Sequence, residues 1–372
     1  MTKVYVWSLP TRVAHLMLIA GVALGYLASE EESWLTWHAA FGYMVGALLL
    51  LRIGWGFLSI PYSRFKDFTF DLEELKAYLF NIFGTKKHYI GHNPASSYAI
   101  VAMLILGLLT VLSGMLLYGI QEGLGLFASL NLSYFKEMEG LKTLHALFTN
   151  LFLAVIFIHI SGVLMDRFIH RTDTLNAMID GYKRADPNTP SVDLSPFQKF
   201  YGVLWIALPF ILFGSALSVP NSVLTQSIHQ PVSYKSEHPL FYEECTTCHI
   251  LYPPHLLPDR SWTKMMGTLE DHFGDDASLE KEDTQAILDY LVAHSAQQSS
   301  QEAAYKISQS IRKKDIIAIT ESPYWKRRHQ EIDKTIFKQK NIAKASNCKA
   351  CHGAFESGLL HDKDIAIPKG RP

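Results

Sequence analysis

The 372-residue sequence lacks an excess of charge of either sign, because 34 lysines and arginines are set against 35 aspartates and glutamates, for a net charge of −1. No basic block stands apart from the charges that a membrane topology explains, so nucleic acid is not an expected partner. Charged residues are also missing from several long stretches, and cysteine is missing before residue 245. The mean hydropathy of +0.08 therefore averages two unlike parts, an apolar one up to about Val219 and a polar one that holds all four cysteines.

Five apolar runs have about the length of a membrane-spanning helix, roughly 20 residues. They are Val13–Ala28, Trp37–Leu58, Ser97–Tyr118, Leu144–Met165 and Phe200–Val219. The first run, with Lys3 and Arg12 before it, could by itself be the core of a signal peptide. Because further runs follow it and because it contains His15, we interpret it as a span.

Basic residues between the runs orient the predicted spans. One side of the membrane receives Lys3, Arg12, the basic residues from Arg52 to Lys87, Arg167, Arg171, Lys183, Arg184 and Lys199. The other side receives Glu30, Glu31, Glu32, Glu122, Glu137 and Glu139, with only Lys136 and Lys142 opposing them. Positive charge stays in the cytoplasm, so the N-terminus is predicted to be cytoplasmic and the C-terminal tail to lie outside.

The run Leu144–Met165 has no charged side chain but holds two histidines, His145 and His159, 14 residues apart. On a helix this spacing corresponds to roughly 21 Å along the axis and brings both rings to within about 40° of one face. Either histidine alone could be an interfacial or core residue bonded to its neighbours. Two on one face, at opposite depths of a membrane, favour iron ligands for two stacked haems.

The partners of these two histidines follow from the topology. His15 is predicted to lie with His159 on the cytoplasmic side, and His38 with His145 on the outer side. Each pair would hold one haem b. Two imidazoles close both axial positions of the iron, which suits electron transfer and disfavours oxygen chemistry.

All four cysteines belong to two C-x-x-C-H motifs, which are the attachment signature of haem c. The motifs are Cys245-Thr-Thr-Cys248-His249 and Cys348-Lys-Ala-Cys351-His352, in which the cysteines bind the haem covalently and the histidine is the proximal iron ligand. A four-cysteine zinc site or a pair of redox-active dithiols is the alternative. Haem c attachment in bacteria takes place outside the cytoplasm, where the topology independently places this tail.

The apolar part resembles the bacterial cytochrome b561 family, which includes the cytochrome b subunits of nickel–iron hydrogenases. The resemblance covers about residues 1–184 and rests on WSLPTRVAHLML, HAAFGYMVGALLLLRIGWGF, SRFKDF, GHNPASSYAIVAMLILGLLTVLSGM and MIDGYKR, together with the two histidines of the fourth run. It implies a four-helix bundle that holds two haems b and exchanges electrons with membrane quinone. The four histidines named above occupy the ligand positions of the family. The fifth run departs from the family, and we interpret it as a tether.

The tail resembles the periplasmic dihaem cytochromes c that donate electrons to small soluble haem proteins. The matching segments are ECTTCHILYPPHLLPDRSWTKMMGTLEDHFGDDASL, ITESPYWKRRHQEI and NCKACHGAFESG. The family implies His272 and His329 as distal ligands; we assign His272 to the first haem c and His329 to the second, although the pairing could be crossed. Met265 and Met266 are competing ligands, but adjacent methionines in a helix are more often core residues.

The remaining polar residues have plainer interpretations. We predict that His88, His92, His170, His238, His255, His294 and His361 are surface residues, with a lesser quinone-site alternative for the first three. The basic run Lys326-Arg327-Arg328 is either simply solvated or a docking face for an acidic partner. Gly42, Gly46, Gly107 and Gly114 permit close approach of another helix or of a flat macrocycle.

Together these features predict an all-α protein: a transmembrane bundle with a four-helix haem b core and a fifth span, followed by a small, mainly helical dihaem cytochrome c domain. The expected domains are residues 1–190, the fifth helix and tether at 191–225, and the outer domain at 226–372. Short helices are predicted in the outer domain at Trp262–Phe273, Lys281–His294, Gln301–Arg312 and Tyr324–Lys340.

The expected function is electron transfer between the quinone pool and a soluble periplasmic cytochrome or other haem protein, in the bacterial cytoplasmic membrane, through two haems b and two haems c. If the chain is catalytic, it is a quinol:cytochrome c type oxidoreductase. It could instead be the cytochrome subunit that connects a separate periplasmic oxidoreductase to quinone, or a haem c peroxidase or sensor. A quinol site needs a proton acceptor, and Glu30–Glu32, Glu122 and Glu139 on the outer side compete with His88 and His92 on the inner side.

We predict that pyridine haemochrome analysis of the purified protein will give two haems b and two haems c per chain. Cys351→Ser should prevent covalent attachment of the second haem c and destabilise the tail, because a small domain depends on its cofactors for an apolar interior. A protein without non-covalent haem would contradict the predicted membrane part.

Overall fold

A computed structural model describes residues 2–80, 89–132, 140–314 and 316–368 of the chain. It contains two compact units, Met1–Leu117 with Glu139–Thr225 and Tyr118–Met138 with Gln226–Pro372. Both are mostly helical, which confirms the predicted fold class. We call them the membrane unit and the C-terminal unit.

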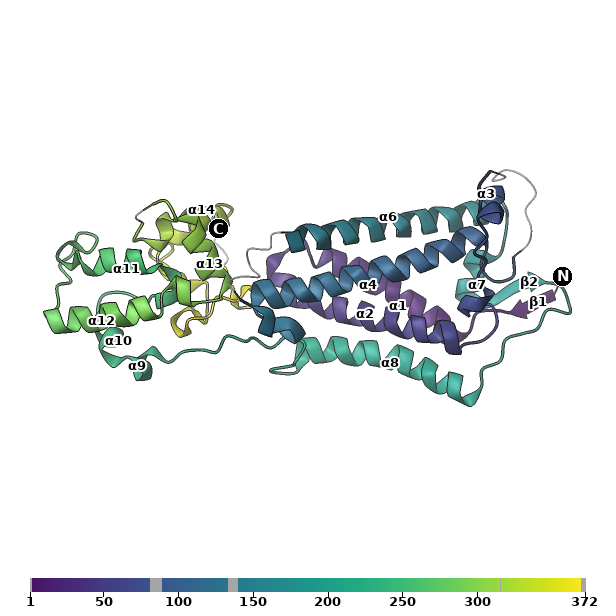
Figure 1. Ribbon diagram of the computed structural model, residues 1–372, viewed down its shortest axis with the longest axis horizontal. Helices are drawn as coiled ribbons and strands as arrows, with labels where there is room; N and C mark the ends of the chain where they lie inside the picture. Colours follow the sequence, from purple (N-terminus) through teal and green to yellow (C-terminus); the bar gives the residue numbers. More distant parts are fainter. Residues whose placement is uncertain (1, 81–88, 133–139, 315, 369–372) are drawn as a thin grey trace. The chain divides into compact units, whose positions relative to one another are not determined.

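The membrane unit contains five helices that are long and apolar enough to cross a membrane. They are α1 (Leu9–Leu27), α2 (Leu35–Leu58), α4 (Pro94–Glu122), α6 (Gly140–Phe168) and α8 (Pro196–Ser218). The five run side by side in Figure 1, with the short helices α3 (Leu72–Phe80) and α7 (Thr174–Asp180) at one end of the bundle. The helices match the five predicted runs and extend beyond most of them. The protein is therefore a multi-pass membrane protein.

Helix α8 packs closely against α1 and α2. The Trp205 indole is 1% exposed, and its Nε1 donates a hydrogen bond of 3.0 Å to the Leu48 carbonyl oxygen. The Tyr201 hydroxyl donates to the Leu51 carbonyl oxygen at 2.9 Å. At the start of α8, Ser195 and Gln198 form a reciprocal capping box. The segment that we interpret as a tether is thus anchored in the bundle by hydrogen bonds as well as by apolar contact.

Helix α6 has a different environment from α2. Within the most apolar window of each helix, 6% of the residues are buried in α6, against 44% in α2. Protein atoms therefore cover little of α6, although it carries two of the predicted ligands. Space remains along α6 for groups other than side chains.

Two short strands, β1 (Thr2–Tyr5) and β2 (Tyr182–Ala185), form an antiparallel pair with Tyr5 opposite Tyr182. The sequence pattern did not predict them, since each has only four residues. Gly181 precedes β2 with a φ of +90°, and its carbonyl oxygen accepts hydrogen bonds from the amides of Val6 and Trp7. A Cβ at Gly181 would lie 2.4 Å from the Tyr5 ring, so this connection requires glycine.

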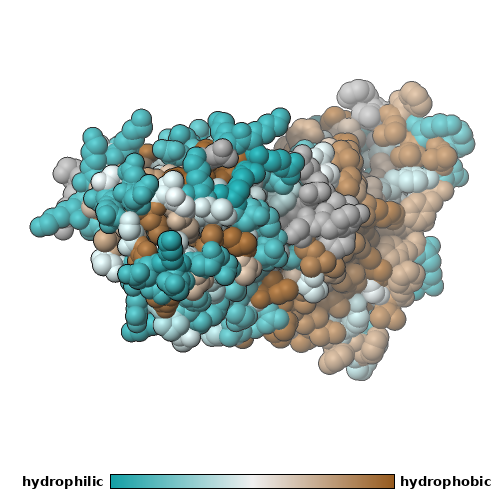
Figure 2. All heavy atoms as spheres, turned by 60° about the vertical axis from the view of Figure 1, so that its left-hand side comes forward, coloured by the Kyte–Doolittle hydropathy of each residue, from teal (hydrophilic) through white to brown (hydrophobic). Residues whose placement is uncertain are grey.

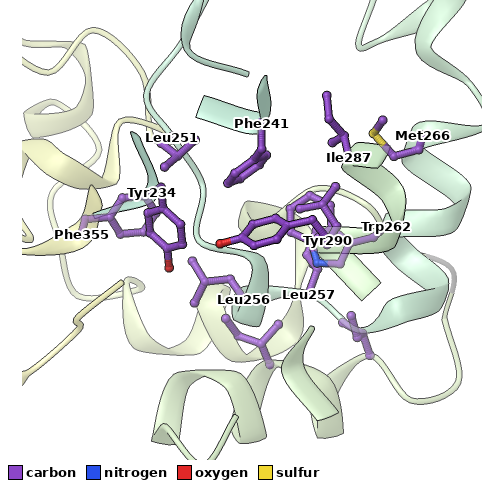
Figure 3. Close-up of a cluster of buried hydrophobic side chains, with 13 residues drawn as sticks. Tyr234, Phe241, Leu251, Leu256, Leu257, Trp262, Met266, Ile287, Tyr290 and Phe355 are labelled. Carbon is purple, nitrogen blue, oxygen red and sulfur yellow. The ribbon is translucent and has the colours of Figure 1, made fainter. Parts of the chain in front are cut away.

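The C-terminal unit is built from short helices around one apolar core. They are α9 (Tyr234–Glu237), α10 (Pro239–Thr246), α11 (Asp259–Met266), α12 (Lys281–Ala293), α13 (Glu302–Ser310) and α14 (Pro323–Arg328). In Figure 3, Phe241 and Tyr290 lie together in the middle of this core, with ring centres 5.3 Å apart. Trp262 is 4% exposed, and its Nε1 donates to the Pro254 carbonyl oxygen at 2.7 Å.

Two of the predicted helices in this unit are shorter than expected. The helix predicted at Trp262–Phe273 ends at Met266, where Gly267 forms the C-cap, and His272 lies in a tight turn in which Phe273 and Gly274 have φ of +58° and +95°. The helix predicted at Tyr324–Lys340 ends at Arg328, and Asp333 then accepts a side-chain hydrogen bond from the Thr335 amide. Turn-forming side chains compete with the helix at both places.

The two units differ in surface character, as a membrane protein with a hydrophilic domain requires. In Figure 2, brown hydrophobic side chains cover most of the visible helical bundle, whereas teal hydrophilic side chains dominate the C-terminal unit. Exposed apolar residues of α6 include Phe157, Ile158 and Ile160. A lipid bilayer is the environment that such a surface needs.

We predict that Ile287→Ala destabilises the C-terminal unit by about 2–5 kcal/mol, since this side chain is fully buried in the core. Pulse proteolysis of the full-length protein across a urea series, with detection of the C-terminal fragment, measures the effect. Lys281→Ala on the same helix is the control, because Lys281 is exposed and should leave the urea midpoint unchanged. Equal midpoints for the two variants would contradict this description of the core.

Candidate haem sites

The eight histidines that the sequence singles out lie in four pairs. In the membrane unit, the ring centres of His15 and His159 are 6.4 Å apart, and those of His38 and His145 are 6.3 Å apart. His15 lies on α1 and His38 on α2, while both partners lie on α6. Helix α6 therefore contributes one imidazole to each pair, as its two-histidine pattern predicted.

The C-terminal unit brings together the other four histidines. The ring centres of His249 and His272 are 6.1 Å apart, and those of His329 and His352 are 6.2 Å apart. Each pair joins the histidine of one C-x-x-C-H motif to one of the two distal candidates. The pairing is the direct one, His272 with the first motif and His329 with the second, rather than the crossed one.

The spacing within the pairs fits one metal ion between two imidazoles. An imidazole nitrogen binds a metal at about 2.0 Å and lies roughly 1.1 Å from the centre of its ring, so two axial imidazoles have centres about 6 Å apart. All four pairs have this spacing, although they occur in two units of unrelated fold. The residues present therefore fit haem ligation at each pair.

Backbone carbonyl groups orient several of these rings. Nδ1 of His38 lies 2.8 Å from the Gly25 oxygen, and Nδ1 of His145 lies 3.1 Å from the Thr110 oxygen. In the C-terminal unit, Nδ1 of His249 and of His329 lie 2.6 and 2.9 Å from the oxygens of Ile250 and Trp325. A carbonyl oxygen only accepts, so each Nδ1 carries the hydrogen and Nε2 is left to bind iron.

Burial favours the neutral form of three of the four paired histidines in the C-terminal unit. It lowers the pKa of His352 to about 4, with smaller contributions from His329 and Arg328, and it also lowers the pKa of His272 and of His329. The neutral imidazole is the form that binds a metal.

The cysteines lie where a macrocycle would complete the core. Cys245 lies in the last turn of α10, and Cys245 and Cys348 both pack against the buried cluster of this unit. Burial raises the pKa of each of these two thiols to about 12, whereas a redox-active cysteine has a lowered pKa. Within the described ranges, no three His, Cys, Asp or Glu side chains gather as a zinc site requires. Both methionine candidates belong to the core or pack against it.

A cavity of about 1040 Å³ in the membrane unit extends from the His15–His159 pair to polar groups near the end of the bundle. Asp166 lies in its wall, where its Oδ1 lies 2.7 Å from Nδ1 of His170 and accepts a hydrogen bond of 3.2 Å from the Tyr78 hydroxyl. The Asn93 amide in turn donates to the Tyr78 oxygen at 2.9 Å. Burial and Asp166 raise the pKa of Tyr78, so this hydroxyl keeps its proton.

Three of the predicted surface histidines are not at the surface. His92 lies between the rings of Trp7 and Phe68, at 4.9 and 4.7 Å, and His170 is held by Asp166. His255 is 7% exposed. Tertiary packing buries these three histidines, although the local sequence around each of them predicts exposure to solvent. His294 is exposed, as predicted, while His88 lies outside the described residues.

The sequence alone did not predict that polar side chains line the wall of this cavity. Asp166 comes seven residues after His159, two helical turns further along α6, and this spacing is the signal that could have indicated it. Arg52 and Lys183 also line the cavity, but the sequence reading used them only to orient the membrane spans.

Two imidazole pairs inside a membrane bundle, and two more beside C-x-x-C-H motifs, define a membrane-bound multihaem cytochrome. Comparison with known families agrees: residues 6–181 match prokaryotic cytochrome b561, and residues 241–359 match dihaem cytochrome c. The N-terminal part of the chain thus belongs to the cytochrome b561 family and its C-terminal part to the dihaem cytochrome c family. The first family implies haem b in the membrane unit and the second implies haem c in the C-terminal unit, and both matches support a haem-based electron-transfer protein of the membrane.

Individual relatives cover one part of the chain or the other. A probable Ni/Fe-hydrogenase B-type cytochrome subunit from Rhizobium leguminosarum bv. viciae is 27% identical over 161 residues, which are 39% of this chain and 66% of that protein, just under two thirds. The dihaem cytochrome c structure from Rhodobacter sphaeroides is 37% identical, covering 35% of this chain and 99% of that one, with a TM-score of 0.31. A dihaem cytochrome c from Shewanella baltica OS155 is 30% identical, covering 37% and 95%, with a TM-score of 0.29.

We predict that Gly114→Ala disturbs the haem b held by His38 and His145, because a Cβ at Gly114 would lie 2.9 Å from Cε1 of His145. The haem b content per chain should fall, or the spectrum of one haem b should shift, while the haem c content stays constant. Gly214→Ala is the matched control, since nothing lies within 4 Å of a Cβ there and its helix, α8, carries none of the paired histidines. Identical haem b spectra in both variants would contradict the proposed role of His145.

Proposed function

We propose that the protein carries electrons between the quinone pool and a soluble periplasmic acceptor, through two haems b ligated by His15–His159 and His38–His145 and two haems c ligated by His249–His272 and His329–His352. The observation that carries this proposal is the placement of four imidazole pairs with nearly equal spacing. Two of these pairs lie in the membrane unit, and each of them includes one histidine of α6. The basic residues on one side of the spans support a cytoplasmic N-terminus and a periplasmic C-terminal unit in the bacterial cytoplasmic membrane.

Haem iron, when bound, alternates between its ferric and ferrous states and so carries one electron at a time. The chain would hold the iron of each haem with two imidazoles, and a haem held in this way is suited to electron transfer and not to binding oxygen or peroxide. The chain also surrounds the sites with apolar side chains, and burial and ligand type tune reduction potentials. Each of these features favours electron transfer over catalysis at the iron.

The cavity beside the His15–His159 pair supports a quinol site on the cytoplasmic side. Oxidation of a quinol releases protons, so the site needs a nearby group that accepts them. Asp166 and His170 form such a carboxylate–imidazole pair, and Tyr78 and Asn93 extend the hydrogen-bonded chain. We infer that the quinol headgroup binds in the cavity, against these residues, and passes a proton to the Asp166–His170 pair.

A second function has one specific observation in its favour. The relative from Rhizobium is described as a hydrogenase cytochrome subunit, which supports a role in connecting a separate periplasmic oxidoreductase to quinone. The matching family covers only the membrane part, whereas this chain has its own dihaem cytochrome c. That second part favours a soluble haem protein as the acceptor. A haem c peroxidase or sensor would need a displaceable ligand, so carbon monoxide binding to the reduced protein would identify it.

We predict that decylquinol reduces the haems of the purified protein and that an added soluble cytochrome c is then reduced in turn. Asp166→Asn should slow reduction by decylquinol by about 10²-fold, because the amide cannot accept the proton, while dithionite should still reduce every haem.

Asp180→Asn is the control, because Asp180 is exposed and its Oδ1 only accepts a hydrogen bond from the Tyr182 amide, which asparagine can also do. Turnover that appears only with an added oxidoreductase would favour the second function. An unchanged decylquinol rate in Asp166→Asn would exclude Asp166 as the proton acceptor.

A further inference from the structure

A pair of basic side chains lines the cavity that contains His15 and His159. Arg52 comes from the last third of α2, and Lys183 from strand β2. Lys183 is only 6% exposed, which is unusual for a lysine. Both residues therefore place positive charge against the inside of the membrane unit.

The contacts of this basic pair are neutral. Nη2 of Arg52 donates a long hydrogen bond of 3.4 Å to the Ser63 carbonyl oxygen, and the guanidinium lies over the Phe65 ring at 5.5 Å. Nζ of Lys183 donates to the Gly91 carbonyl oxygen at 3.3 Å and lies 5.6 Å from the centre of the Trp7 ring. Among the residues that the structure describes, neither side chain has a carboxylate within 4 Å.

Two nitrogen atoms at this end of the cavity are buried without any hydrogen-bond partner in the described part of the chain. They are Nη1 of Arg52 and Nδ1 of His92. Burial lowers the pKa of His92 to about 3, and the charges of Arg52 and Lys183 contribute in the same direction, so this ring is neutral. Burial likewise lowers the pKa of Lys183 to about 8, although Asp166 and Asp173 act in the opposite direction from beyond ion-pair distance.

A buried cation is stable only when it is paired, and a cation in a membrane protein faces the same requirement more strongly. The cavity therefore needs an anion next to Arg52 and Lys183. The group that would enter it is a haem, which has two carboxylates on one edge of its ring. The number and sign of the charges match.

We propose that Arg52 and Lys183 bind the two carboxylates of the haem b that His15 and His159 ligate, so that this basic pair fixes the rotation of the macrocycle about the axis between the two imidazoles. The proposal rests on the proposed ligation by His15 and His159, but not on quinol as the substrate. The cavity would then have two binding regions: Arg52 and Lys183 would bind the haem, and the wall with Asp166 and His170 would bind the quinol.

The direct test compares haem with haem dimethyl ester, in which both carboxylates are blocked. Full-length protein is depleted of its haem b and titrated with each compound. The wild type should bind haem more tightly than the ester by at least about tenfold, the free-energy scale of a charge-assisted hydrogen bond. Arg52→Gln combined with Lys183→Gln should bind the two equally. Equal binding of both by the wild type would overturn the proposal, and would point to a lipid phosphate or a free anion as the partner of the basic pair.

Redox titration of the full-length protein provides a second readout. Arg52→Gln should lower the midpoint potential of one haem b, because a nearby positive charge favours the ferrous state, and Arg52→Lys should restore it. The same potential should become pH-dependent near neutrality in Arg52→Gln, since a carboxylate that loses its cation gains a higher pKa.

Arg167→Gln is the control for the loss of one positive charge. Arg167 is exposed and lies in the last turn of α6, the helix that carries His159. If Arg52→Gln and Arg167→Gln shift the potential equally, the proposal fails. These titrations do not depend on the decylquinol assay, so a failure of that assay would not affect them. Loss of one haem b in both Arg52→Lys and Arg52→Gln would mean that Arg52 is required for folding and not for binding the haem carboxylates.

Discussion

The separation between paired imidazoles is the constraint on which the rest of the molecule depends. Two rings that share one iron must hold their centres about 6 Å apart, a tolerance much narrower than that of ordinary apolar packing. In the membrane unit this fixes α6 at a set distance from α1 and from α2. Carbonyl groups of neighbouring helices fix the ring tautomers, and Gly114 provides room for His145. In the C-terminal unit the same spacing joins turns that share no regular secondary structure.

This constraint also divides the membrane unit into two kinds of packing. Helices α1, α2 and α8 are held by direct contacts such as those of Trp205 with Leu48. Helix α6 has few buried residues, and two of its side chains are the histidines that face partners on α1 and α2. Haem binding and the position of α6 are therefore linked, since a ligand that binds only the folded state stabilises it by mass action.

Much of this arrangement was predictable from sequence, for identifiable reasons. The apolar runs and the C-x-x-C-H motifs are local signals, and the 14-residue spacing of His145 and His159 places both on one helix face. The distal positions His272 and His329 needed a family resemblance, because turns carry no periodic signal. Burial of His92 and His255, the strand pair at Gly181 and the early ends of α11 and α14 depend on contacts distant in sequence. Arg52 and Asp166 are informative only once the cavity is known.

The packing of α8 has a kinetic consequence. This helix lies beyond the matched cytochrome b561 region, yet its hydrogen bonds to α2 fix the point at which the chain leaves the bundle. Only residues 219–233 separate it from α9, the first helix after α8 in the C-terminal unit. Two modules joined by so short a linker meet at an effective concentration in the millimolar range, whatever their abundance in the cell. A separate cytochrome c would have to find the membrane protein by diffusion, whereas under the proposed function the electron exchange between these two covalently joined parts is unimolecular and independent of expression level.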